Sequence, residues 1–137
     1  MTMTNDKQLQ DFLALAGRIL LAAIFVMSGY GKIGSFATTA GYMASKGVPM
    51  ASVLLVPTII IELGGSLMLI FGYRARLAAI VLFLFLIPVT LMFHNFWAAA
   101  AADVQMQTIN FMKNLGIMGG MLMVAAFGPG RLSLDKS

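Results

Sequence analysis

The feature that most constrains this chain is the segment Val56–Gly72, VPTIIIELGGSLMLIFG, which is apolar except for one carboxylate near its middle, Glu62. A run of this length and hydrophobicity predicts a membrane-spanning helix. A carboxylate at the centre of a span costs at least ~2.5–3.5 kcal/mol on insertion scales, so it requires a partner or a function. The other polar residues of the chain can therefore be judged by their relation to Glu62.

The composition supports the same interpretation. The chain has 137 residues, of which 60% are hydrophobic and only 10% charged, and its mean hydropathy is +0.91. With this composition, a water-soluble domain of the same size would have too few polar side chains to cover its surface. We therefore expect a single integral membrane domain over residues 1–137, in contact with the lipid bilayer. The formal charge of +4 is scattered among apolar runs and forms no basic stripe, so no nucleic acid partner is expected.

The chain contains no cysteine and one histidine, His94. Iron–sulfur ligation, thiolate catalysis and thiolate-bound metals are thereby excluded. One histidine cannot supply both axial ligands of a haem, although a pair with one of the twelve methionines stays formally open. We expect no haem, iron–sulfur or metal centre, and the methionines are interpreted as adaptable packing residues. Any redox group would be a bound small molecule or would belong to a partner subunit.

Four apolar segments predict four transmembrane helices, at about residues 12–30, 50–72, 77–97 and 108–127. The tight turn between the second and third segments makes these helices antiparallel neighbours, and Pro88 is expected to kink the third. The loop at residues 31–49 is long enough to hold a short helix or to fold back over the bundle. The predicted fold is all-α, an integral membrane four-helix antiparallel bundle with a structured outer loop between the first and second helices.

The distribution of basic residues predicts the orientation of the bundle. Four spans place both ends of the chain on one side. The residues assigned to that side are Lys7, Arg74, Arg76, Arg131 and Lys136, against Lys32 and Lys46 on the other. The positive-inside rule therefore predicts an inner-membrane protein with both termini in the cytoplasm. The first ten residues have no basic region leading to a cleavage site, so no removed signal peptide is expected.

Polar residues inside the spans fall at two depths. At 1.5 Å per residue, Arg18 lies roughly 9 Å and Glu62 roughly 15 Å from the cytoplasmic ends of their spans, which predicts an Arg18–Glu62 ion pair. His94, Lys113 and Asn114 share a level nearer the outer surface. With two cations in the spans against one anion, the interior suits an anionic or strongly hydrogen-bond-accepting ligand, such as a quinone carbonyl.

A purely structural interpretation of these residues also exists. Polar groups in spans often only hold helices together, and each typically contributes under ~1 kcal/mol. Arg18 and Lys113 could extend their long side chains to the two interfaces. For Lys32 and His94 taken alone, this structural interpretation is the preferred one. It does not serve for Glu62, because a carboxylate at mid-span is too short to reach either interface.

Small residues indicate where the helices approach one another. Gly29 falls on one face of the first span with Arg18 and Lys32, and Gly65 lies one turn after the mid-span carboxylate. Gly116 and Gly120 form a GxxxG pair in the fourth span, a spacing that permits close helix contact. We therefore predict that these four glycines are packing positions in a tight bundle with a polar seam.

The ordered set of these motifs resembles the DoxX family of small bacterial membrane proteins. The similar segments are Arg18-x6-Phe25-x3-Gly29-x2-Lys32, ELGG followed by Gly72, LMFHNF, FMKNLGIMGG and the closing GPGRLSLD. The similarity covers essentially the whole chain. It implies a four-helix inner-membrane protein, in a family whose members are associated with membrane oxidoreductases, including a subunit of a thiosulfate:quinone oxidoreductase. The motif positions present here are Arg18, Gly29, Lys32, Glu62, His94, Lys113 and Asn114.

The leading hypothesis is a component of a membrane oxidoreductase system that binds quinone or a similar amphipathic molecule in the bundle. Glu62 and His94 are the candidate catalytic residues, with Glu62 exchanging protons, and Arg18, Lys32, Lys113 and Asn114 are the candidate ligand-binding residues. A partner oxidoreductase subunit is expected under this hypothesis, and a homo-oligomer is compatible with it. The alternative is a non-enzymatic membrane adaptor for a partner enzyme. A third hypothesis, a small transporter or lipid-binding protein, lacks visible inverted repeats.

Overall fold

The computed structural model describes residues 3–135, and within this range the chain forms helices and no strands. The elements are α1 (Met3–Gly34), α2 (Phe36–Ser45), α3 (Ala51–Phe71), α4 (Ala75–Phe93), the short 3-10 helices η1 (Phe96–Ala98) and η2 (Ala101–Asp103), and α5 (Val104–Phe127). The predicted all-α fold is confirmed. Four helical segments of the described chain are long and apolar enough to cross a membrane.

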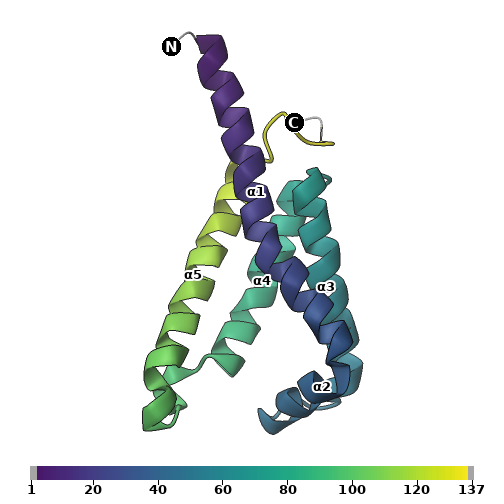
Figure 1. Cartoon of the computed structure of the whole chain (residues 1–137), viewed down its shortest axis with the longest axis vertical. Helices are drawn as coiled ribbons and strands as arrows, with labels where there is room; N and C mark the ends of the chain where they lie inside the picture. Colours follow the sequence, from purple (N-terminus) through teal and green to yellow (C-terminus); the bar gives the residue numbers. More distant parts are fainter. Residues whose placement is uncertain (1–2, 136–137) are drawn as a thin grey trace.

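The four long helices run along the molecule, and the two ends of the described chain lie at the same end of it (Figure 1). α3 packs between α1 and α4, and α5 packs mainly on α4. The short helix α2 lies at the opposite end, against α3, while the first turns of α1 extend beyond the other helices (Figure 1). Consecutive long helices run antiparallel, as predicted (Figure 1).

The helix boundaries differ from the predicted spans in physically understandable ways. α1 begins well before residue 12, because the polar segment at its start contains no proline or glycine that would stop a helix. α4 ends at Phe93, before the predicted end at Trp97, and the chain then turns through η1. α5 begins at Val104 and not near residue 108. Pro57 and Pro88 are accommodated inside α3 and α4.

The predicted outer loop contains a helix that folds back onto the bundle. Ala40 and Met43 of α2 form a small apolar cluster with Ala51 and Leu55 of α3. The return to α3 passes through Gly47, whose φ of 87° is in the left-handed region that glycine enters without strain. This end of the bundle is therefore covered by a packed helix.

Three of the four predicted packing glycines lie where two helices come closest. A Cβ atom added at these positions would lie 2.7–3.1 Å from a leucine of a neighbouring helix. The pairs are Gly29 with Leu63, Gly65 with Leu82, and Gly120 with Leu21. A Cβ added at Gly116 would meet no atom within 4 Å, so the GxxxG pair of α5 is only half used in the contacts of this chain.

Candidate functional site

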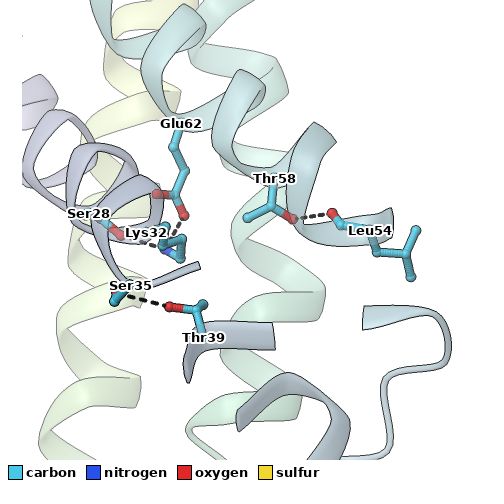
Figure 2. Close-up of polar contacts among 7 residues, drawn as sticks. All are labelled: Ser28, Lys32, Ser35, Thr39, Leu54, Thr58 and Glu62. Carbon is cyan, nitrogen blue, oxygen red and sulfur yellow. Dashed lines mark hydrogen bonds and ion pairs between the residues drawn. The ribbon is translucent and has the colours of Figure 1, made fainter. Parts of the chain in front are cut away.

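Glu62 is buried in the bundle and forms an ion pair with Lys32. The residue is 4% exposed, and its Oε1 atom accepts a hydrogen bond of 2.7 Å from Lys32 Nζ. The same ammonium group donates to Ser28 Oγ at 2.6 Å. Figure 2 shows Lys32 between these two oxygens, joining the last turns of α1 to the middle of α3. The pair therefore fixes two helices and neutralises the mid-span carboxylate.

The predicted Arg18–Glu62 pair is wrong. Arg18 is 1% exposed, and its Nη1 atom donates to Leu69 O at 2.7 Å and to Ile70 O at 3.0 Å, while Nη2 donates to Leu132 O. The physical reason is that the last carbonyl groups of a helix have no partner within it. A guanidinium group offers five donors in a planar fork and can satisfy several such carbonyls together. Arg18 therefore serves the end of α3, about two turns away from Glu62.

The closing GPGRLSLD segment completes this end of the bundle. Leu134 N donates to Phe71 O at 3.0 Å and Asp135 N donates to Gly72 O at 2.9 Å, both at the end of α3. The Asp135 carboxylate accepts hydrogen bonds from Arg74 N at 2.7 Å and Ala75 N at 2.9 Å, at the start of α4. Asp135 therefore caps α4 from sixty positions away. Lys136, which was assigned to this side, lies outside the described residues.

A cavity of about 340 Å³ lies beside the Lys32–Glu62 pair, in the half of the bundle covered by α2. Its lining comprises Ile24, Phe25, Ser28, Lys32, Thr39, Tyr42, Met43, Thr58, Glu62, Phe85, Leu86, Val89, Phe93, His94, Asn114 and Ile117. Each of the α-helices from α1 to α5 contributes residues to this lining. Most of the wall is hydrocarbon or aromatic ring, and a few polar groups project from it, as is usual for small-molecule sites.

Four of the six predicted catalytic and ligand-binding residues lie on this lining, namely Lys32, Glu62, His94 and Asn114. His94 Nδ1 lies 2.9 Å from Gln107 Oε1. Asn114 Nδ2 donates to Thr90 Oγ1 at 3.1 Å, which leaves the Asn114 carbonyl oxygen as an acceptor. Two of the three residues of the predicted outer level, His94 and Asn114, thus lie on the wall of the cavity that also contains the mid-span carboxylate.

Arg18 and Lys113 do not lie on the lining. Arg18 belongs to the α3 end described above, and Lys113 is exposed on the outer surface of α5. The two residues expected to give the interior an excess of positive charge therefore lie elsewhere. Lys32 and Glu62 are the formally charged side chains of the described lining when His94 is neutral. The expected cationic interior is wrong for this cavity, which is electrically balanced.

The sequence interpretation missed several lining residues. Ser28 lies one turn before Lys32, a spacing that could have indicated their contact. Thr39 and Tyr42 come from α2, in the outer loop that was predicted to be able to hold a short helix. Tyr42 stacks on Phe93 with ring centroids 5.7 Å apart. No periodicity in the sequence relates α2 to the end of α4, so this contact required the tertiary structure.

The site has unused hydrogen-bonding capacity. A lysine ammonium has three donors, and two of those of Lys32 are engaged by Ser28 and Glu62, which leaves one. The Lys32 side chain is 24% exposed, whereas that of Glu62 is 5% exposed. Glu62 Oε2 is buried without a hydrogen-bond partner among the residues that the structure describes. Lys32 can therefore donate one hydrogen bond to a ligand, while its ammonium group stays in contact with the Glu62 carboxylate.

Four helices that can cross a membrane, with a partly open cavity lined by an ion pair, define a small multi-span membrane protein with a polar site between its helices. The family model DoxX matches residues 13–95. The chain belongs to the DoxX family, as its motifs suggested.

Relatives of this chain are known in bacteria and in yeast. The chain is 38% identical to inner membrane protein YqjF of Escherichia coli K12, over 95% of each chain. It is 32% identical to inner membrane protein YphA of the same organism, over 90% of this chain and 89% of the relative. A 26% identical match covers 96% of this chain but only 35% of the ER-derived vesicles protein ERV29 of Saccharomyces cerevisiae. No solved structure gives a significant match.

Proposed function

We propose that this protein binds a quinone or a similar amphipathic molecule in the cavity beside Lys32 and Glu62, as a component of a membrane oxidoreductase system. The observation that carries the proposal is the ion pair between Lys32 and the buried Glu62 carboxylate, on the wall of a cavity that is otherwise mainly apolar. Ionisable residues inside membrane spans are costly and commonly mark a ligand or proton path. A pair used only for helix contact would not need a cavity beside it.

Lys32 is the residue that would orient the ligand. Its remaining N–H group can donate to a carbonyl oxygen of the head group, and this donor is held in place by Ser28 and Glu62. Hydrogen bonds from an ionised donor are stronger than those between neutral groups. On reduction, a quinone carbonyl gains negative charge, and transfer of a proton from Lys32 to that oxygen would leave the reduced head group uncharged.

Glu62 would act with Lys32 as the proton-exchanging group. It lies on the cavity wall and contacts Lys32 directly. After Lys32 gives a proton to the reduced head group, the Glu62 carboxylate would take up a proton from water and return it to the Lys32 amine. His94 and Asn114 stand on the wall contributed by the end of α4 and by α5. They would bind a second oxygen of the head group, with His94 held by Gln107.

The size and the walls of the cavity suit such a head group. Its volume of about 340 Å³ is near the lower end of the roughly 300–1,000 Å³ that is typical of small-molecule sites. Phe25, Phe85 and Phe93 supply aromatic rings to the lining, and these rings can pack against a flat ring. An apolar tail would extend between the helices toward lipid.

Electrons would come from a partner subunit, because the chain has no cysteine and a single histidine with which to hold a redox centre. We place the protein in the bacterial inner membrane with both termini in the cytoplasm. The names of YqjF and YphA support the membrane assignment. The exposed Arg74 and Arg76 lie at the turn from α3 to α4, and the exposed Arg131 lies in the closing segment that hydrogen-bonds to this turn. Their location on one side supports the orientation.

Titration of a decyl-substituted benzoquinone against the purified protein in a nonionic detergent tests the proposal. Quenching of Trp97 or isothermal calorimetry would report binding. We expect saturable binding to the wild type and at least about tenfold weaker binding to Lys32→Met, since a buried hydrogen bond from a charged group is lost. Glu62→Gln should also weaken binding, because Lys32 would lose the acceptor that orients it.

Lys113→Met is the matched control, since it removes a cation of α5 that does not line the cavity. Its affinity for the quinone should equal that of the wild type. Absence of saturable binding to the wild type, or equal affinities for wild type and Lys32→Met, would refute the proposal. If Glu62→Gln then lost only thermal stability and capture of a partner protein, the adaptor hypothesis would replace it.

A further inference from the structure

We propose that the cavity selects an uncharged ligand, and that the Lys32–Glu62 ion pair is the charge filter that enforces this selection. The inference rests on the proposed function in that it concerns the same cavity. It does not depend on the ligand being a quinone. Of the two ligand types that the sequence suggested, anionic or strongly hydrogen-bond-accepting, it keeps only the second, and it follows from where the structure puts each charged side chain.

The charges around the cavity cancel at close range. Among the described lining residues, Lys32 and Glu62 carry the formal charges, and their charged atoms lie 2.7 Å apart. Arg18 donates to the carbonyls of Leu69 and Ile70 at the end of α3 and to that of Leu132 in the closing segment, and it does not line the cavity. Lys113 is exposed on α5 and does not reach the lining. A ligand in the cavity therefore meets a neutral dipole and no unbalanced charge.

A charged head group would have no counter-charge there. An anion placed next to Lys32 would also lie close to the Glu62 carboxylate, and a cation next to Glu62 would lie close to the ammonium group. Most of the remaining lining is apolar, including Phe25, Leu86 and Val89. Burial of an unpaired charge in such surroundings is strongly unfavourable. A neutral group needs only an acceptor oxygen for the remaining N–H of Lys32.

The filter can be tested with two probes of nearly equal size that differ in charge. Para-decylbenzenesulfonamide is uncharged, and para-decylbenzenesulfonate is a permanent anion with the same tail and ring. Both present sulfonyl oxygens that can accept a hydrogen bond. We expect the wild-type protein in nonionic detergent to bind the sulfonamide at least about tenfold more tightly than the sulfonate, because like-charge contact and desolvation penalise the anion.

Removal of either partner should change the selectivity in opposite directions. Glu62→Gln leaves Lys32 unbalanced, so this variant should prefer the sulfonate to the sulfonamide. Lys32→Met leaves the carboxylate unbalanced, so it should instead prefer para-decylphenyl-trimethylammonium. The double variant Lys32→Met/Glu62→Gln is again neutral and should reject both ions. Lys113→Met should keep the wild-type order of affinities, since its side chain lies outside the cavity.

The outcomes separate the charge filter from the quinone proposal. Equal binding of sulfonamide and sulfonate by the wild type overturns the filter, even if decyl-benzoquinone binds. Binding of the sulfonamide alone, without binding of the benzoquinone, supports the filter and ends the quinone proposal. Absence of binding by all probes overturns both. The wild-type comparison alone decides the matter should the single variants fail to fold.

Discussion

Replacement of Arg18 by methionine should loosen the end of the bundle where α3 meets the closing segment of the chain. The guanidinium group donates to Leu69 O at 2.7 Å, to Ile70 O at 3.0 Å and to Leu132 O. Methionine has a similar unbranched stem, so most of the apolar packing of the side chain would be kept. The variant therefore isolates the loss of hydrogen bonds to three backbone carbonyls.

The expected magnitude follows from these three bonds. Each hydrogen bond from a charged donor contributes about 1.5–3 kcal/mol. Part of that gain is offset by the desolvation of the guanidinium group, which methionine does not incur. We therefore expect Arg18→Met to lower the free energy of unfolding by about 2–5 kcal/mol. Arg18→Lys should lie between methionine and the wild type, because an ammonium group cannot reproduce the planar fork.

Unfolding in mixed micelles with increasing dodecyl sulfate, followed by far-ultraviolet circular dichroism, measures this change. Carboxypeptidase digestion gives an independent measurement, since loss of the bond to Leu132 should expose the closing segment. Arg74→Met is a suitable control, because the Arg74 side chain is exposed and lies over the Tyr73 ring, 5.8 Å from its centroid. If the free energy of unfolding of Arg18→Met lay within about 1 kcal/mol of that of Arg74→Met, the three hydrogen bonds of Arg18 would not stabilise the bundle as argued.

Three further results are expected in the same unfolding assay. Asp135→Ala removes the cap of α4 and should cost about 1–2 kcal/mol; an unchanged free energy would mean that this cap contributes nothing. Gly29→Ala places a Cβ atom 2.7 Å from a leucine of α3 and should cost about 1–3 kcal/mol, whereas Gly116→Ala, with no atom within 4 Å, should be neutral or stabilising; equal effects would contradict the packing assignment. Glu62→Gln should cost about 3–5 kcal/mol by leaving Lys32 unpaired, and the double variant Lys32→Met/Glu62→Gln should regain most of that loss; additive losses would show that the pair is not coupled.

The sequence by itself determined the class of the fold. Four apolar runs of sufficient length leave a membrane-spanning helix as the only stable conformation, because backbone groups in lipid must be hydrogen-bonded within the segment. The tight turn between the second and third segments then makes these two helices antiparallel neighbours. The cost of a carboxylate at mid-span likewise singled out Glu62, and the motif pattern identified the family. These inferences depend on local composition and length.

Only the tertiary structure decided which charges meet. The depth of a residue was counted from expected helix ends, and this placed Arg18 near Glu62. The counting could not include the rotation of each helix, the reach of the Lys32 side chain along α1, or the return of the closing segment to α3. These contacts join residues separated by 30 positions in the Lys32–Glu62 pair and by 114 in the Arg18–Leu132 bond.

Helix packing therefore decides which cation pairs with Glu62. A buried carboxylate must be neutralised, and the sequence offers more than one cation that could do so. The packing of α1 on α3 selects Lys32, because it brings that side chain to the level of Glu62, while the carbonyls at the end of α3 engage Arg18. That selection also leaves the cavity balanced in charge.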